Sequence, residues 1–304
     1  MLELIMENLI PKISLKNLLS NDSYSLELLS RALKNHGFFV ITDHSIPHDL
    51  FQEAYAFSEN FFNLDSSIKN NYSFRKNAGA RGYTPFGKET ALGETVPDLK
   101  EFWHHGPVVD DTYDHRIMKN IYVNEIKEFN EVFDNLFAEM NNLGSTLLKS
   151  ISLTLDLPPD FFTKSTSKGN SLLRLIHYPP SNNENMFRAR EHADINLITL
   201  LIGANEPGLE VKDKSGKWIP VSSSFEDIVC NIGDMMQLIT DKILKSTPHR
   251  VVKYKSDEIK SRYSIPFFLH PSPDTTLKSI YDEDDVGVLA HDFLDERLKA
   301  IKLY

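Results

Sequence analysis

The spacing of apolar residues changes near the middle of the chain. In the first half, apolar side chains recur every three or four residues, which is typical of amphipathic helices. Helices are therefore expected over Ser25 to Asn35, from Pro47 to Phe62 and over Asn124 to Leu155. The apolar run at 38–42 predicts a buried strand after the first of these helices. The first half is thus expected to be mainly helical.

The second half contains short β-prone runs that are separated by turn residues. Strands are expected over Leu172 to Tyr178, Ile195 to Leu201, Leu209 to Lys212, Trp218 to Val221, Ile228 to Ile232, Met235 to Leu238, Arg250 to Tyr254 and Tyr263 to His270. About eight strands of this length predict a jelly roll. The glycine-rich stretch from Arg75 to Glu94 is expected to be a surface loop, and the tail from Asp284 to Tyr304 a closing helix.

Together these patterns predict a mainly β protein with flanking helices. Its core is a double-stranded β-helix, or jelly roll, and a mostly helical N-terminal region precedes it. The expected boundaries are 1–120 for the N-terminal region, 121–165 for a long connecting helix, 166–275 for the jelly-roll core and 276–304 for the C-terminal helix.

Composition narrows the classes of protein. With 304 residues, 41% hydrophobic and 25% charged, the chain has the composition of a soluble globular protein. Its net charge of -10 and the lack of a dense basic run argue against nucleic acid as a partner. We expect no secretory signal and no membrane span, because no apolar run is long enough. Cys230, the single cysteine, is expected to be a buried hydrophobe, which fits a reducing cytoplasm.

The chemistry is concentrated in one ordered series of polar residues. His192-x-Asp194 is followed, after 54 intervening residues, by His249. Two imidazoles and a carboxylate can occupy one face of an octahedral iron(II) and leave the other positions open. A single His-x-Asp is more often a structural pair than a metal site, so the interpretation depends on the surrounding sequence. In a jelly roll, strands that are distant in sequence meet at one mouth of the barrel.

Several segments resemble the iron(II)- and 2-oxoglutarate-dependent dioxygenases, in the branch similar to isopenicillin N synthase. These segments are His36-Gly37-Phe38-Phe39-Val40, Asp43-His44-Ser45-Ile46-Pro47, Gly208-Leu209-Glu210-Val211, Asn231-Ile232-Gly233-Asp234, Ser246-Thr247-Pro248-His249-Arg250-Val251 and Arg262-Tyr263-Ser264-Ile265. The resemblance extends from about Ile10 to about His270. It implies iron(II), 2-oxoglutarate and dioxygen as cofactor and co-substrates.

The resemblance also implies roles for individual residues. Its metal ligands would be His192, Asp194 and His249, and its 2-oxoglutarate carboxylate site would be Arg262, Ser264 and Tyr178. A guanidinium offers a planar fork that matches a carboxylate, and a residue two positions along a strand points to the same face. Plant members of the family often carry Asn two residues before the tyrosine, where this chain has Ile176.

Residues on the substrate side are harder to assign. Period-2 alternation places Phe102 with His104, and Phe268 with His270, so that each pair shares one face of a strand. Arg81 and Tyr83, in the glycine-rich loop, are candidates for a lid. Each of these six residues is equally well explained by packing in the core.

The expected reaction is oxidation, most simply hydroxylation, of an unactivated C–H bond of a small molecule, with release of succinate and carbon dioxide. Desaturation and ring formation are also open. Two alternatives are a 2-oxoglutarate-independent iron oxidase of the isopenicillin N synthase type, which the Ile176 departure keeps open, and a non-catalytic metal-binding jelly roll. The sequence specifies neither the primary substrate nor the oligomeric state.

Overall fold

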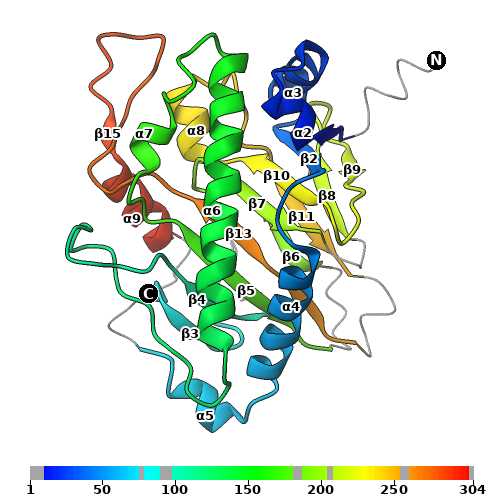
Figure 1. Ribbon diagram of the computed structural model, residues 1–304, viewed down its shortest axis with the longest axis vertical. Coiled ribbons are helices and arrows are strands. Elements are labelled where there is room, and N and C mark those ends of the chain that lie inside the picture. Colours follow the sequence, from blue (N-terminus) through cyan, green and yellow to red (C-terminus); the bar gives the residue numbers. More distant parts are fainter. Residues whose placement is uncertain are drawn as a thin grey trace.

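Two sheets face each other in the computed structural model, which describes residues 10–74, 79–89, 98–180, 187–203, 208–253 and 260–300 (Figure 1). The larger sheet has the strand order β1 (Lys12–Ser14), β2 (Phe38–Thr42), β10 (Ile228–Ile232), β7 (Ile198–Ile202), β13 (Pro266–Leu269), β5 (Leu172–Tyr178), β4 (Glu101–His105), β3 (Gly82–Thr84), and β12 (Arg262–Ser264) also pairs with β5. The smaller sheet has the order β6 (Phe187–His192), β11 (His249–Val252), β8 (Leu209–Lys212), β9 (Trp218–Pro220). Strands from both sheets form the predicted jelly roll.

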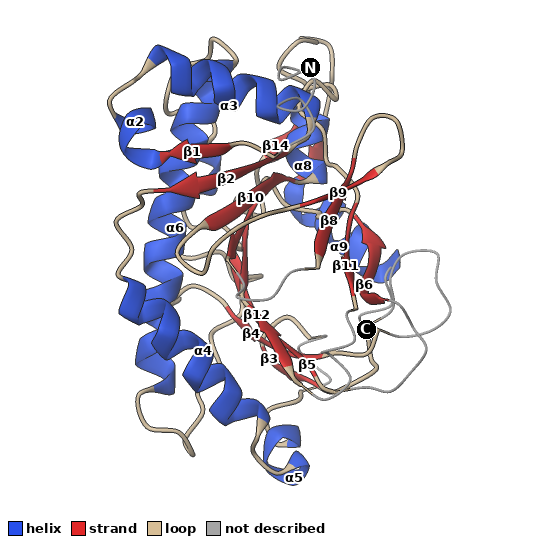
Figure 2. Cartoon of the chain, turned by 90° about the vertical axis from the view of Figure 1, so that its right-hand side faces the viewer, coloured by secondary structure: helices blue, strands red, loops and turns tan. Residues whose placement is uncertain are grey.

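Helices cover the outer face of the larger sheet, and the smaller sheet faces its inner side (Figure 2). The helices are α2 (Leu15–Leu19), α3 (Ser23–Asn35), α4 (His48–Phe62), α5 (Ser66–Asn70), α6 (Phe129–Thr154), α7 (Thr163–Thr166), α8 (Asp234–Ile239) and α9 (Ala290–Ala300). A short hairpin of β14 (Thr276–Leu277) and β15 (Val288–Leu289) precedes α9. The side chains between the sheets come mainly from strands, joined by Leu294, Arg297 and Leu298 of α9, while α3, α4 and α6 pack on the outer face of the larger sheet.

The packing of α6 against the larger sheet forms the main hydrophobic core. Phe137 on α6 meets Phe267 on β13 with ring centroids 5.2 Å apart, and Phe267 is fully buried. Gly144 lets the helix approach closely, because a Cβ there would lie 3.1 Å from Leu269. The alternation on β13 places Phe267 and Leu269 in this core and turns Phe268 toward the cavity between the sheets.

Local sequence signals explain where α3 begins and ends. The carboxylate of Asp22 accepts a hydrogen bond of 2.8 Å from the backbone N–H of Ser25, which caps the first turn. Gly37 follows the helix with φ +64°, and a Cβ there would lie 2.1 Å from the carbonyl oxygen of Lys245. Glycine is therefore required both by the backbone angle and by the space at this position.

One strand prediction was wrong, and one strand was missed. The run from Met235 to Leu238 lies in helix α8, because Met235, Met236 and Ile239 are buried at helical spacing after an extended Gly233. A short apolar run does not distinguish the two structures. Strand β6, which carries His192, was not predicted, because its sequence Phe-Arg-Ala-Arg-Glu-His has few apolar residues. The expected strand from Tyr263 to His270 is divided into β12 and β13.

Smaller differences concern the ends of elements. The long helix α6 begins at Phe129, five residues later than expected. The helix that was expected within 284–304 is α9. The predicted surface loop contains strand β3, while its residues 75–78 and 90–94 lie outside the described part. Cys230 is buried, as expected. The predicted strand at 38–42 is confirmed as β2.

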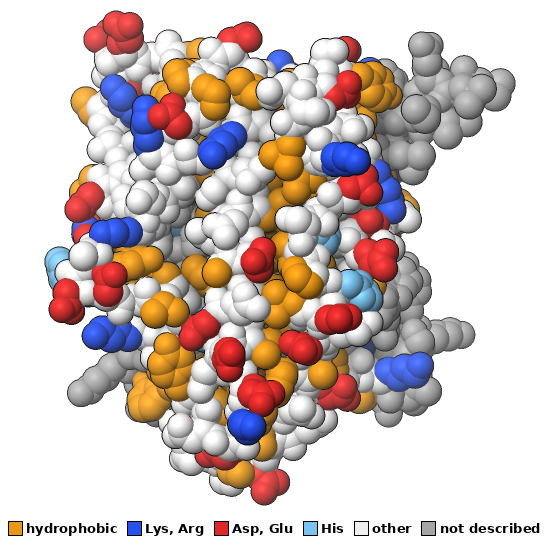
Figure 3. Space-filling view, in the orientation of Figure 1, with side chains coloured by type: hydrophobic (Ala, Val, Ile, Leu, Met, Phe, Trp, Pro, Cys, Tyr) orange, Lys and Arg blue, Asp and Glu red, His pale blue; other side chains and the backbone are white. Residues whose placement is uncertain are grey.

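The surface carries charges of both signs. Acidic and basic side chains are interspersed over the face that α4 and α6 cover (Figure 3). Within the described residues, we find no helix that has both the length and the apolar character needed to cross a membrane.

The contact between α6 and the sheet generates a stability prediction. Replacing Phe267 with Ala should lower the free energy of unfolding by about 3–5 kcal/mol, because it removes a fully buried ring and leaves a cavity. Tyr24→Ala, at a side chain that is 62% exposed, should change it by less than about 0.5 kcal/mol. Urea titration of both variants measures the difference, and equal losses would contradict this account of the core.

Candidate metal centre and active site

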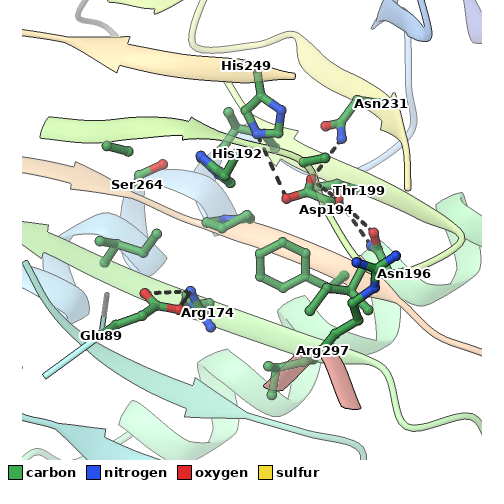
Figure 4. A pocket seen from close by; sticks show the side chains of 18 of the residues that line it. Glu89, Arg174, His192, Asp194, Asn196, Thr199, Asn231, His249, Ser264 and Arg297 are labelled. Carbon is green, nitrogen blue, oxygen red and sulfur yellow. Dashed lines mark hydrogen bonds and ion pairs between the residues drawn. The ribbon is translucent and has the colours of Figure 1, made fainter. Parts of the chain in front are cut away.

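His192, Asp194 and His249 converge at one end of the jelly roll, as Figure 4 shows. His192 ends β6 and His249 begins β11, and the antiparallel register pairs them directly. Their ring centroids are 4.3 Å apart. The Nε2 atom of His249 lies 3.8 Å from Oδ1 of Asp194, and one ligand atom from each of the three residues lies within 4.8 Å of the others. The sequence predicted this proximity although His249 is distant from the other two residues along the chain.

Hydrogen bonds orient all three side chains. The Nδ1 atoms of His192 and His249 lie 2.7 Å and 3.3 Å from the backbone carbonyl oxygens of Arg190 and Thr247. If each Nδ1–H donates to its carbonyl, each Nε2 keeps a lone pair for a metal. Both acceptors belong to the backbone, so the type of residue at these positions does not reveal them.

Asp194 is held from the larger sheet. Its Oδ2 atom accepts hydrogen bonds from the hydroxyl of Thr199 at 2.5 Å and from the amide of Asn231 at 2.7 Å. The other oxygen, Oδ1, faces His249. One oxygen therefore fixes the carboxylate, and the other is positioned as a ligand.

The electrostatics favour the protonation states that a metal needs. Burial, together with the neighbouring His249, lowers the pKa of His192 to about 4, so this imidazole is neutral at pH 7. Burial raises the pKa of Asp194, but the two imidazoles and the bonds from Asn231 and Thr199 outweigh it and leave the pKa below its usual value. A neutral imidazole beside an ionised carboxylate suits a divalent cation.

A cavity of about 450 Å³ extends from this triad between the two sheets. The cavity-facing side of β5 carries Leu172, Arg174, Ile176 and Tyr178 in alternation. The register places Arg262 opposite Tyr178, and Ser264 opposite Ile176. All the residues predicted to bind the 2-oxoglutarate carboxylate are thus adjacent on two paired strands.

Arg262 has unused hydrogen-bonding capacity. Its side chain is 5% exposed, and its Nε and Nη1 atoms have no partner among the described residues. Its guanidinium carbon lies 5.7 Å from the centre of the Tyr178 ring. A buried guanidinium with free donors is costly unless an anion fills the space beside it.

The structure also places each residue that the sequence proposed on the substrate side. Four of them line the cavity, namely Arg81, His104, Phe268 and His270. Phe102 is fully buried behind the wall, in a cluster with Ile176 and Tyr178. Tyr83 lies outside the cavity lining and donates its hydroxyl to Glu101, so its position corrects the suggestion of a lid residue.

A buried ion-pair network, which the sequence analysis did not predict, forms one wall of the cavity. Lys100 Nζ lies 2.7 Å from Glu89 and 3.0 Å from Asp98, and Arg174 lies 3.2 Å from Glu89. Nε of Arg174 also donates a 2.6 Å hydrogen bond to Nε2 of His104. Burial and the adjacent Arg174 lower the pKa of His104, which is neutral. Extending the alternation of Phe102 and His104 back to Lys100 would have found this lysine.

Comparisons with known proteins agree with this geometry. Residues 169–271 match the 2OG-Fe(II) oxygenase superfamily, and residues 10–125 match the N-terminal region of non-haem dioxygenases in morphine synthesis. A 2-oxoglutarate-dependent dioxygenase from Didymella fabae is 30% identical over 296 residues, 92% of this chain and 87% of that protein. The chain therefore belongs to the iron(II)- and 2-oxoglutarate-dependent oxygenases.

Solved structures support the same conclusion. A 2OG-Fe(II) oxygenase family protein from Caulobacter crescentus has a TM-score of 0.88 at 36% identity, covering 96% of this chain and 99% of that one. A full-length Neurospora crassa protein, solved in complex with alpha-KG, has a TM-score of 0.85 at 26% identity, covering 96% and 97%. The jelly-roll fold, the dioxygenase class and the requirement for iron(II) and 2-oxoglutarate are confirmed.

The electrostatics of the cavity predict a pH effect on the metal-free protein. Burial lowers the pKa of His270 to about 4, below the usual value of 6.5. The unfolded chain therefore binds a proton that the folded chain rejects, and stability falls as the pH decreases from 6.5 toward 4. His270→Gln should lose about 2 kcal/mol less stability than the parent protein between about pH 7 and pH 5. His115→Gln, at a side chain that is 91% exposed, should retain the parent slope in urea titrations.

Proposed function

We propose that His192, Asp194 and His249 hold the iron(II), and that Arg262, Ser264 and Tyr178 hold the far carboxylate of 2-oxoglutarate, in an enzyme that hydroxylates a small molecule. The observation that carries this proposal is the buried guanidinium of Arg262. Its Nε and Nη1 lack partners among the described residues, and its neighbours Ser264 and Tyr178 line the cavity that the triad enters. Iron(II), 2-oxoglutarate and dioxygen together supply the oxidation of an unactivated C–H bond and release succinate and carbon dioxide.

The residues of the chain perform the positioning. Tyr178 and Ser264 line the cavity, and Arg262 lies two residues before Ser264 on β12, so the two side chains share one face of the strand. Three donors would thus surround one carboxylate, two from β12 and one from β5. Ile176, which is 7% exposed, packs in the cluster with Phe102 and offers no polar contact to 2-oxoglutarate. Arg262 is therefore the main group that orients the 2-oxoglutarate carboxylate.

The cavity fits a small substrate. A volume of about 450 Å³ lies within the range of small-molecule sites, which is about 300–1,000 Å³. The Neurospora crassa protein has also been solved with alpha-KG and thymine, which is a small molecule. The rings of Phe268 and Phe102 lie 5.4 Å and 4.5 Å from the guanidinium of Arg174, which gives the wall both apolar and charged groups.

The triad assignment is tested by removing one ligand. His192→Ala and Asp194→Ala should each abolish tight binding of manganese(II) in calorimetry and reduce succinate formation by at least about 100-fold. His115→Ala, at an exposed imidazole outside the cavity, should leave both quantities unchanged. Parent-like manganese binding in both triad variants would refute the assignment.

The carboxylate assignment is tested separately. Arg262→Gln should weaken 2-oxoglutarate binding about 100-fold, because it leaves a buried carboxylate without its charged partner, while manganese binding is retained. Arg31→Gln, at a side chain that is 57% exposed, serves as the control. An unaltered affinity in Arg262→Gln would place the carboxylate elsewhere. Oxygen consumption that proceeds without 2-oxoglutarate would indicate the oxidase alternative.

A further inference from the structure

A second buried guanidinium, that of Arg81, lies beyond the opposite end of β5 from Arg262. Arg81 is 3% exposed and lines the cavity together with Asn170 and His270. Along β5, Tyr178 pairs with Arg262, while Leu172, six residues away, pairs with Phe268. At about 3.3 Å per residue the two ends are about 20 Å apart. Asn170 and His270 continue these two strands beyond that point.

The metal centre lies close to this second end. The carboxylate of Asp194 accepts a hydrogen bond from Thr199, whose cross-strand partner is Phe268. His270 follows two residues later, and the charge of Asp194 acts on it. A molecule seated at Arg81 would therefore extend toward the triad from the side opposite to 2-oxoglutarate.

The charge of Arg81 has no counterpart in the described part of the chain. Its Nη1 donates to the backbone oxygen of Ala80 at 2.7 Å, and its Nη2 donates to Oδ1 of Asn170 at 3.2 Å. Its Nε has no hydrogen-bond partner, and none of the described carboxylates pairs with it. Burial lowers the pKa of Arg81 to about 10, so it is a cation at pH 7.

The other cations of the cavity wall are neutralised. Arg174 pairs with Glu89, Lys100 pairs with Glu89 and Asp98, and Arg297 lies 3.5 Å from Asp234. An unpaired guanidinium in such a site is costly, and the cost is removed when a ligand supplies the anion.

The orientation of Arg81 is fixed by its neighbours. A Cβ at Gly106 would lie 2.3 Å from the Nε, Cζ and Nη2 atoms of Arg81, so the guanidinium plane packs against the bare backbone there. Nε and Nη2 form the edge of a guanidinium that binds a carboxylate through two parallel hydrogen bonds. Nε is unused and Nη2 makes only the long contact to Asn170, so this edge remains available.

Building on the proposed function, we infer that Arg81, Asn170 and His270 bind a carboxylate group of the primary substrate, which is therefore a small carboxylic acid. One guanidinium balances one negative charge, and His270 adds a neutral ring whose Nδ1 has no partner among the described residues. Asn170 accepts from Arg81 with its oxygen, so its amide N–H groups are donors toward the ligand. A doubly charged phosphate would leave one buried charge unbalanced.

The test uses the full chain loaded with manganese(II) and saturating 2-oxoglutarate. Manganese(II) in place of iron(II) prevents turnover, and 2-oxoglutarate keeps Arg262 occupied. Calorimetry compares acids with their primary amides, using acetate against acetamide and benzoate against benzamide. We expect each acid to bind at least tenfold more tightly than its amide. Equal affinities, including no measurable binding of either member, would overturn the inference.

Asn170→Asp is the decisive variant, because it places a carboxylate beside Arg81 without removing the guanidinium from its packed position. The preference for the acid should disappear, while 2-oxoglutarate affinity stays at the parent value and the unfolding temperature does not fall. Asn142→Asp adds the same charge at an exposed position on α6 and should keep the preference. Retention of the preference in Asn170→Asp would show that the acids bind the metal instead and would overturn the inference.

Two further arms separate the remaining outcomes. Arg262→Gln should keep the preference for the acid. If the preference is lost in this variant, the probes occupy the 2-oxoglutarate site. That outcome would overturn this inference and leave the proposed function intact. Inorganic phosphate should bind more weakly than benzoate. Tighter binding of phosphate that is lost in Asn170→Asp would overturn the assignment of a carboxylic acid.

Discussion

The site depends on the way in which Asp194 joins the two sheets. His192 and His249 belong to the smaller sheet, where their cross-strand pairing fixes the distance between the two rings. Asp194 follows β6, yet its carboxylate is held by Thr199 and Asn231 from the larger sheet. A ligand set of this kind forms only when the sandwich has closed at this end. The metal centre and the closure of the fold are therefore one structural event, and the packing of α6 stabilises both from behind.

Buried charge defines the rest of the cavity. Most cations in its wall are matched by carboxylates, and these pairs fix the wall without favouring any ligand. Arg262 and Arg81 differ because each retains donor atoms in a buried position that have no partner among the described residues. In a low-dielectric cavity, such donors stabilise a bound anion more strongly than donors that are already hydrogen-bonded to water. Under the two proposals, Arg262 and Arg81 would orient a co-substrate and a substrate toward the same metal from opposite sides.

Alternation along strands made much of the site predictable from the sequence. Arg262 and Ser264 share a face on β12, as the alternation indicated, and Tyr178, which the family resemblance implied, is their neighbour across the sheet. The missed elements have identifiable causes. Strand β6 has few apolar residues because Arg188 and Glu191 bind other polar groups and His192 belongs to the triad, and α8 resembles a strand because its apolar run is short. The ion pair between Lys100 and Glu89 could not be predicted, because no local sequence pattern relates these two positions.

The two ends of the cavity also differ in how the chain builds them. Tyr178, Arg262 and Ser264 lie on paired strands, where the register of the sheet fixes their separation. Arg81 precedes β3, Asn170 precedes β5 and His270 follows β13, so all three lie just outside the strands. Loops tolerate substitution that strands do not, and binding specificity changes most readily there. Under the two proposals, the co-substrate binds where the sheet register fixes the side chains and the substrate binds among loop residues, so the identity of the substrate is to be sought in those loop residues.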